Sequence, residues 1–238
     1  MPEAPPEFGK LTLEERKYLA LRLLDEQIVD ARKRLHFWRS LTNQPAQVDS
    51  GYISQHLVSL VTHLRGGGFR GKGLDLEDGS EVKSANFLDS EDARGAVAPR
   101  WNFTVKQQSE MFAYLECKWI YLVSIDKHGA AVRVRVWRLS PGEHQPFNQR
   151  FKDWAERVGF PIFRKRGKRR NDANFQLFPP RNGSADDYAR HGGGGPAGPR
   201  KVRFAELKIM LEEPPGSVLL FHAEQQDGGK FRLVHWAA

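Results

Sequence analysis

The sequence has a single cysteine, Cys117, among its 238 residues. One cysteine excludes an internal disulfide framework and a cysteine-rich zinc site, and it is typical of a protein of the reducing cytoplasm. Long apolar runs are absent too, since no stretch approaches the roughly 20 residues that a membrane-spanning helix needs. Residues 1–8 are acidic and rich in proline and lack the apolar core of a secretory signal. We therefore expect a cytoplasmic protein with neither a leader nor a membrane anchor.

Acidic residues are in the minority, with 29 Asp and Glu against 37 Lys and Arg, which gives a net charge of +8. The excess is local, because residues 161–203 contain eleven basic and three acidic residues and so account for the whole net charge. The rest of the chain is balanced and has enough apolar residues for a folded domain. A basic segment of this kind indicates a polyanionic partner such as nucleic acid, although a solvated basic loop is the alternative.

Apolar periodicity predicts both helices and strands. Thr12 and Glu15 form a capping-box pattern at the start of the first helix. Three valines alternate with arginines in residues 130–139, so we expect a strand with one buried face and one cationic face. The mixed order of elements predicts an α+β (mixed α/β) fold, a sheet flanked by helices. The expected helices are residues 11–41, 52–64, 107–116, 147–158 and 204–211, and the expected strands are 118–126, 130–139, 217–222 and 230–236.

Residues 74–85 are expected to form a β-hairpin, for which two registers are open. A two-residue turn at Asp78 and Gly79 would mix charged and apolar side chains on each face. A three-residue loop of residues 77–79, with Gly79 in the left-handed conformation, sorts them instead. This sorting favours the second register, because one face of a hairpin is normally buried. The apolar face would then contain Leu74, Leu76 and Val82.

The other face of this hairpin would contain Asp75, Glu81 and Lys83. Two carboxylates directly across a strand pair repel each other, and a divalent cation relieves that repulsion. Mg²⁺ prefers such hard oxygen ligands, and a nearby lysine can hold or deprotonate the water that attacks a phosphorus atom. Glu77 and Asp78 are rival carboxylates, which we expect in the turn and directed to solvent. The pattern indicates metal-dependent phosphodiester hydrolysis, although an ordinary charged surface hairpin is the alternative.

The order Asp75…Glu81-Val82-Lys83 resembles the signature of the PD-(D/E)xK nucleases. The resemblance implies a mixed sheet flanked by helices, with the motif following an N-terminal helix. It also implies that Asp75, Glu81 and the carbonyl of Val82 bind Mg²⁺, that Mn²⁺ substitutes for it, and that Lys83 is the catalytic lysine. The sequence departs from the signature in two respects, since Leu74 replaces the proline and only five residues separate the carboxylates.

A closer resemblance covers about residues 51–102 and carries the stretches GYISQHLVSL, RGKGLDLEDGSEVKSAN and PRWN. These stretches resemble the MamI-type restriction endonucleases. The resemblance implies a type II enzyme that cuts double-stranded DNA as a homodimer on an interrupted palindrome, without a nucleotide cofactor. In related nucleases an acidic residue of the preceding helix assists the metal, but here that helix offers only Gln55 and His56.

Base recognition by such an enzyme requires Arg, Lys and Asn side chains near the cut. Two stretches offer them, the basic run and the end of the loop that follows the motif. Any one cation of these stretches could instead contact phosphate and only position the duplex. The candidate DNA-binding residues are Arg100, Asn102, Arg164, Lys165, Arg166, Lys168, Arg169, Arg170, Asn171 and Asn174.

These patterns predict three parts of the chain: an N-terminal helical segment (1–48), a nuclease core (49–160) and a basic DNA-recognition region whose terminal strands pack on the core (161–238). The function that they favour is Mg²⁺-dependent cleavage of a specific double-stranded DNA sequence. The alternatives are a strand-nicking repair endonuclease and a basic DNA-binding protein without catalytic activity.

Overall fold

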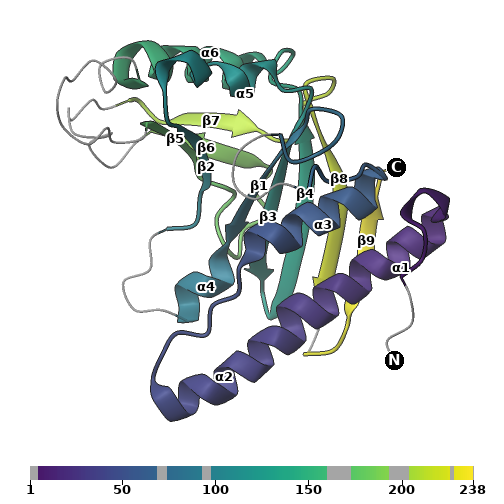
Figure 1. Ribbon diagram of the computed structural model, residues 1–238. Coiled ribbons are helices and arrows are strands. Elements are labelled where there is room, and N and C mark those ends of the chain that lie inside the picture. The colour runs from purple at the N-terminus through teal and green to yellow at the C-terminus, as the bar shows by residue number, and fades with distance from the viewer. Residues whose placement is uncertain are drawn as a thin grey trace.

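The computed structural model describes residues 5–68, 74–92, 98–159, 173–192, 204–225 and 228–237. Its centre is a five-stranded sheet of order β1-β3-β4-β8-β9 (Figure 1). β1 pairs with β3 in parallel, and the other neighbours are antiparallel. The strands are β1 (Glu81–Asn86), β3 (Ile120–His128), β4 (Ala131–Leu139), β8 (Ser217–Gln225) and β9 (Phe231–Trp236). The predicted α+β class, a mixed sheet flanked by helices, is confirmed.

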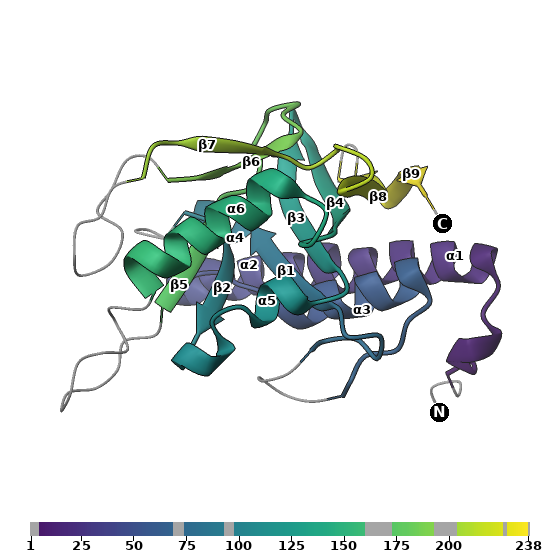
Figure 2. The same ribbon diagram turned by 90° about the horizontal axis from the view of Figure 1, so that it is seen from above.

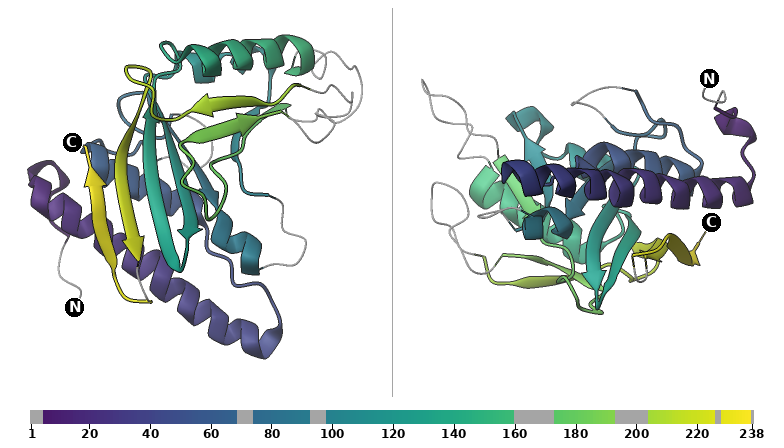
Figure 3. Two further views of the ribbon diagram at one scale, coloured as in Figure 1. Left: turned by 180° about the vertical axis from the view of Figure 1, so that it is seen from behind. Right: turned by 90° about the horizontal axis from the view of Figure 1, so that it is seen from below.

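Two long helical segments cover one face of the sheet (Figures 1 and 3). The Thr12 hydroxyl accepts a hydrogen bond from the Glu15 N–H at 3.3 Å, and the Glu15 carboxylate accepts one from the Thr12 N–H at 2.8 Å, so the predicted capping box is present. Buried side chains of both segments join those of β1, β3 and β4 in one apolar cluster. The segments are α1 (Leu13–Leu24), a π-helical stretch (Asp25–Asp30) and α2 (Ala31–Thr42), then α3 (Ser50–Thr62). Both predicted helices are confirmed.

The opposite face carries two small sheets and two further helices (Figure 2). The rings of Phe103, Phe147, Phe151 and Phe175 pack with centroids 4.9–6.4 Å apart and form the centre of a second core. The small sheets pair β2 (Trp101–Val105) with β5 (Ala173–Leu177) and β6 (Tyr188–His191) with β7 (Leu207–Met210). The helices are α5 (Ala113–Glu116) and α6 (Gln145–Trp154). Shorter elements are 3₁₀ turns at Phe8–Lys10 and Gln108–Glu110, α4 (Phe87–Asp92) and a π-helical turn at Ala155–Gly159.

Two sequence-based helix predictions are wrong in the structure. Residues 204–211 form no helix, because Leu207–Met210 pairs with β6 as an antiparallel strand. Apolar periodicity over four residues cannot distinguish a helix from a strand. Here the segment forms a strand because β6 offers an edge with which it can pair. The predicted helix 107–116 is divided into the 3₁₀ turn Gln108–Glu110 and α5.

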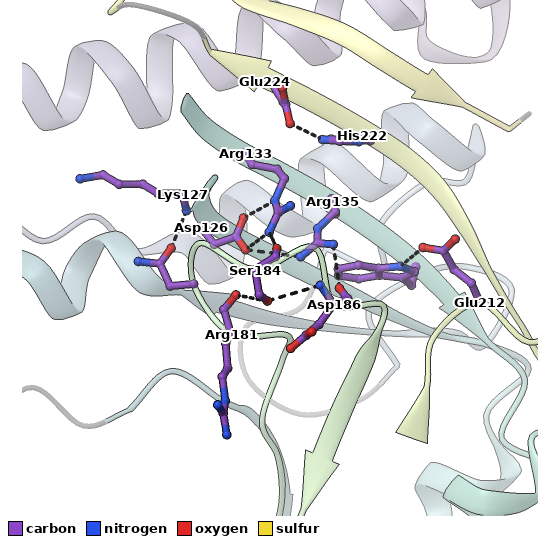
Figure 4. A network of polar contacts seen from close by, with 12 residues as sticks. Asp126, Lys127, Arg133, Arg135, Arg181, Ser184, Asp186, Glu212, His222 and Glu224 are labelled. Atoms are coloured by element: carbon purple, nitrogen blue, oxygen red, sulfur yellow. Dashed lines mark hydrogen bonds and ion pairs between the residues drawn. The ribbon is translucent and has the colours of Figure 1, made fainter. Parts of the chain in front are cut away.

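The expectation of a cationic face on β4 is also wrong, because two of its arginines are buried. Arg133 and Arg135 are 3% and 6% exposed, and both contact the fully buried Asp126 of β3 (Figure 4). Arg133 also donates to the Ser184 carbonyl at 2.8 Å, and Arg135 donates to that of Asp186 at 3.2 Å. The loop between β5 and β6 therefore covers this part of the sheet.

In the part of the chain that the structure describes, no helix combines the length and the apolar character needed to cross a membrane.

Candidate active site

The candidate site is built around the turn that precedes β1. The Gly79 N–H donates to the Leu76 carbonyl at 3.1 Å, and the Leu76 N–H donates to the Ser80 carbonyl at 3.2 Å. Gly79 has φ +86°, a conformation that favours glycine. The predicted three-residue loop 77–79 with a left-handed Gly79 is therefore confirmed, and the two-residue alternative is wrong.

The two strands predicted on either side of this turn do not form a hairpin. The Glu81 N–H bonds to the Trp119 carbonyl at 3.0 Å, and β1 pairs in parallel with β3. Leu76 forms only an isolated bridge, and its partner is Gly66. Pairing with a strand distant in sequence therefore replaces the local pairing that the alternation predicted.

The side chain of Asp75 takes the place that a paired strand would occupy beside β1. Its Oδ2 accepts a hydrogen bond from the Val82 N–H at 2.8 Å, and its Oδ1 accepts one from Gln55 Nε2 of α3 at 2.7 Å. These two contacts fix the carboxylate between the helix and the strand. Asp75 therefore lies close to Glu81, as predicted, but the link is the hydrogen bond from the Val82 N–H to the Asp75 carboxylate and not pairing of two strands.

Glu81 and Lys83 form an ion pair at the start of β1, with side chains 10% and 15% exposed. The Lys83 ammonium also lies over two aromatic rings, 4.9 Å from the centroid of Tyr114 and 5.8 Å from that of Phe103. Tyr114 is held by a hydrogen bond of 3.2 Å from its hydroxyl to the Thr104 carbonyl. The ion pair and the two rings therefore fix the position of the ammonium group.

Burial dominates the electrostatics of these groups. It raises the pKa of Asp75, while the Val82 N–H and Lys83 act in the opposite direction. It also raises the pKa of Glu81, which Lys83 lowers and Asp75 raises further. Burial is the largest effect on Lys83 and lowers its pKa, but Glu81, Tyr114 and Asp75 together raise it, so the net shift is upward. Burial and Glu81 raise the pKa of Cys117 to about 12, so this thiol is unreactive at neutral pH.

Glu81 and Lys83 line an open cleft of about 750 Å³. One wall comes from β1 and the residue Leu74, and the opposite wall comes from β2 and the segment that contains α5. Its other lining residues are Asn102, Thr104, Lys106, Glu110, Ala113, Tyr114, Glu116 and Cys117. The cleft gives an extended substrate access to the ion pair.

Two details of the predicted motif are wrong. Leu74 is 48% exposed and does not share the buried face of Leu76 and Val82. The Asp78 side chain is only 10% exposed and does not point to solvent, because it accepts the Ser80 N–H at 3.1 Å and pairs with Lys118 at 3.4 Å. Asp78 therefore stabilises the turn.

The donor set fits a divalent cation. In a strand the N–H and C=O of one residue point to the same edge. Because the Val82 N–H points to Asp75, the Val82 carbonyl lies on that edge as well, away from β3. Two partly buried carboxylates and a main-chain carbonyl suit Mg²⁺, which keeps several waters. In the described ranges, this site included, no group of three or more His, Cys, Asp or Glu residues gathers as a metal site, so the candidate ligands are two carboxylates and one carbonyl.

Only three candidate DNA-binding residues lie in the described part of the chain. Asn102 of β2 and Asn174 of β5 are exposed, and Arg100 donates to Gln176 at 3.2 Å. Outside the described residues lie Arg164, Lys165, Arg166, Lys168, Arg169, Arg170 and Asn171. Sequence reasoning did not assign Gln55 or Tyr114 to the site, because their contacts join segments that are distant in sequence.

Comparison with known proteins identifies the family of the chain. The family model described as MamI restriction endonuclease matches residues 37–223. A curated relative, "Type II restriction enzyme MamI" from Microbacterium ammoniaphilum, is 34% identical over 190 residues, which cover 73% of this chain and 57% of the relative. The chain thus spans little more than half the length of that relative. No solved structure matches this chain. On the extent of these matches, the chain belongs to the MamI restriction endonuclease family.

Proposed function

We propose that this chain is a type II restriction endonuclease that hydrolyses phosphodiester bonds at a specific double-stranded DNA sequence with Mg²⁺. The observation that carries the proposal is that Glu81 and Lys83 line an open cleft while Asp75 binds the intervening Val82 N–H, in a chain of this family. We further infer a homodimer, the use of Mn²⁺ in place of Mg²⁺ and the division of the chain into parts 1–48, 49–160 and 161–238.

Each residue has a distinct role in this proposal. Asp75, Glu81 and the carbonyl of Val82 hold the metal ion, which when bound neutralises charge on the scissile phosphate. Gln55 orients the Asp75 carboxylate through its hydrogen bond of 2.7 Å. Lys83, which Glu81 and Tyr114 hold at the cleft, orients the water that attacks the phosphorus atom.

The test is digestion of a long linear DNA of known sequence with Mg²⁺, followed by run-off sequencing of the products. Discrete fragments with one common end sequence support the proposal. Lys83→Ala should abolish cleavage and leave DNA binding largely intact. Lys118→Ala, which removes a lysine with 58% side-chain exposure outside the cleft, should cleave normally.

Three outcomes contradict parts of the proposal. Full activity of Lys83→Ala would disprove the assignment of the site. A supercoiled plasmid converted only to open circles would identify a strand-nicking enzyme. DNA binding without cleavage in Mg²⁺ or Mn²⁺ would identify a DNA-binding protein without catalytic activity.

A further inference from the structure

β2 and β5 form an antiparallel pair, which we name the β2–β5 ribbon (Figures 1 and 2). The side chains on its two faces differ. Phe103 and Phe175 are opposite each other in the register, and both are fully buried in the aromatic core. Because successive side chains of a strand point to opposite faces, the residues between them face outward. The outer face carries Asn102 opposite Gln176 and Thr104 opposite Asn174.

This outer face borders the candidate active site. Asn102 and Thr104 line the same cleft as Glu81 and Lys83. Lys106, which follows β2, extends the lining by one more side chain. A duplex whose backbone reaches Lys83 would therefore also lie against the ribbon.

Hydrogen bonds within the ribbon orient the side-chain amides of Asn174 and Gln176 and leave their NH₂ groups available to a ligand. Thr104 Oγ1 donates to Asn174 Oδ1 at 2.7 Å, and Arg100 Nη1 donates to Gln176 Oε1 at 3.2 Å. Each amide oxygen thus accepts one hydrogen bond and keeps its second lone pair, and no hydrogen bond from either NH₂ group is seen among the described residues. Within the described residues the exposed Asn102 side chain makes no hydrogen bond, so both its donor and its acceptor remain available.

The chemistry of this face suits base edges better than phosphates. Phosphate contacts come mainly from Lys and Arg, whereas Asn and Gln can pair with adenine through donor and acceptor together. The two cationic residues that flank β2, Arg100 and Lys106, lie at the margin of this face. The major groove of B-DNA admits a two-stranded ribbon, and the donors and acceptors on its base edges distinguish all four base pairs, whereas those of the minor groove do not.

We propose that the β2–β5 ribbon reads base edges in the major groove of double-stranded DNA, with Asn102, Asn174 and Gln176 as specificity-determining residues. This inference rests on the proposed function, since it places recognition beside the bond that is cut. The amides discriminate among bases, and the cations around them hold the backbone.

The test selects bound sequences from a randomised duplex pool, with Ca²⁺ in place of Mg²⁺ so that the DNA stays intact. It compares the unmodified chain with Asn102→Ala, Gln176→Ala and the matched control Gln44→Ala, an exposed amide in the loop before α3. The unmodified chain and the control should enrich the same motif. Each ribbon variant should lose preference at one or two positions of the motif by about tenfold, the discrimination expected of one amide–base pair. Affinity for unrelated DNA should stay within about twofold, because phosphate contacts remain.

Three results would overturn the proposal: no enriched motif, an unchanged motif in both ribbon variants, or an equal loss of affinity for all sequences. Far-UV circular dichroism and the melting temperature show whether each variant is folded. Cleavage is measured separately with Mg²⁺ and Mn²⁺. Enrichment of a motif without any cleavage would contradict the proposed nuclease function but not base recognition by the ribbon. Cleavage without sequence preference would contradict base recognition by the ribbon but not the nuclease function.

Discussion

Gln55 Nε2 donates a hydrogen bond of 2.7 Å to Asp75 Oδ1, and this contact joins α3 to the turn before β1. The other carboxylate oxygen accepts the Val82 N–H, so both oxygens of Asp75 have a fixed direction. The Gln55 amide contributes no charge, but it orients a carboxylate whose pKa burial raises.

Gln55→Leu keeps the side-chain volume and removes the donor. Because a hydrogen bond to a charged group contributes about 1.5–3 kcal/mol, we expect the Mg²⁺ concentration for half-maximal cleavage to rise by about tenfold or more. A magnesium titration of the initial cleavage rate measures this. Gln27→Leu, the same change at an exposed amide in the π-helical stretch Asp25–Asp30, is the control and should titrate normally. Equal curves for both variants would contradict a role for Gln55 in orienting Asp75.

Tyr114 holds the ammonium group of Lys83 at 4.9 Å from its ring centroid. Tyr114→Phe keeps the ring face, whereas Tyr114→Leu removes it, so we expect near-normal cleavage from the first and a loss of roughly tenfold in kcat from the second. KM should change little in either variant, because the ring fixes a catalytic group and contacts no DNA in this assignment. Single-turnover cleavage rates at saturating enzyme measure the effect, and equal rates for both variants would disprove it.

The turn before β1 could be predicted from the sequence because its determinants are local. Gly79 permits the left-handed conformation, and alternation along β1 places Glu81 and Lys83 on one face. The partner of β1 could not be predicted in this way. Glu81 pairs with Ile120, and no local pattern records a pairing over that separation.

The same reasoning explains the parts of the site that sequence did not predict. β2 and β5 are short strands in which buried and exposed side chains alternate. Five residues of either strand do not reveal its partner, which becomes evident only in the structure, where Phe103 and Phe175 lie opposite each other in the aromatic core. For β4 the alternation was recognised, but two of its arginines were wrongly predicted to be exposed. Alternation predicts which residues share a face but not whether that face is covered, and here the loop containing Ser184 covers it.

Asp126→Asn removes the carboxylate that pairs with Arg133 and Arg135 (Figure 4). Burial already lowers the pKa of Arg135 to about 10, against the effect of Asp126, which shows how poorly solvated this guanidinium is. Breaking a buried ion pair from one side typically costs about 3–5 kcal/mol, and we expect a loss of that size in the free energy of unfolding. Urea denaturation followed by tryptophan fluorescence measures it. Glu14→Gln, in an ion pair whose carboxylate is 80% exposed, should leave the midpoint unchanged. An equally small effect of Asp126→Asn would contradict a structural role for the buried network.

His191 gives the fold a defined sensitivity to acid. Its ring stacks on Phe175 at 4.2 Å, and burial together with the charge of Arg150 lowers its pKa from 6.5 to about 4. In the unfolded chain His191 therefore binds a proton below about pH 6.5, whereas in the folded chain it does so only below about pH 4. Between these two values protonation favours the unfolded state, so the contribution of His191 to stability is complete above pH 6.5 and falls as the pH decreases through this interval. A shift of this size corresponds to about 3 kcal/mol. His191→Phe keeps a stacked ring without a titrating group, so its urea midpoint should change less between pH 7 and pH 4.5 than that of the unmodified chain. Parallel pH dependence in the two proteins would show that His191 does not couple folding to protonation.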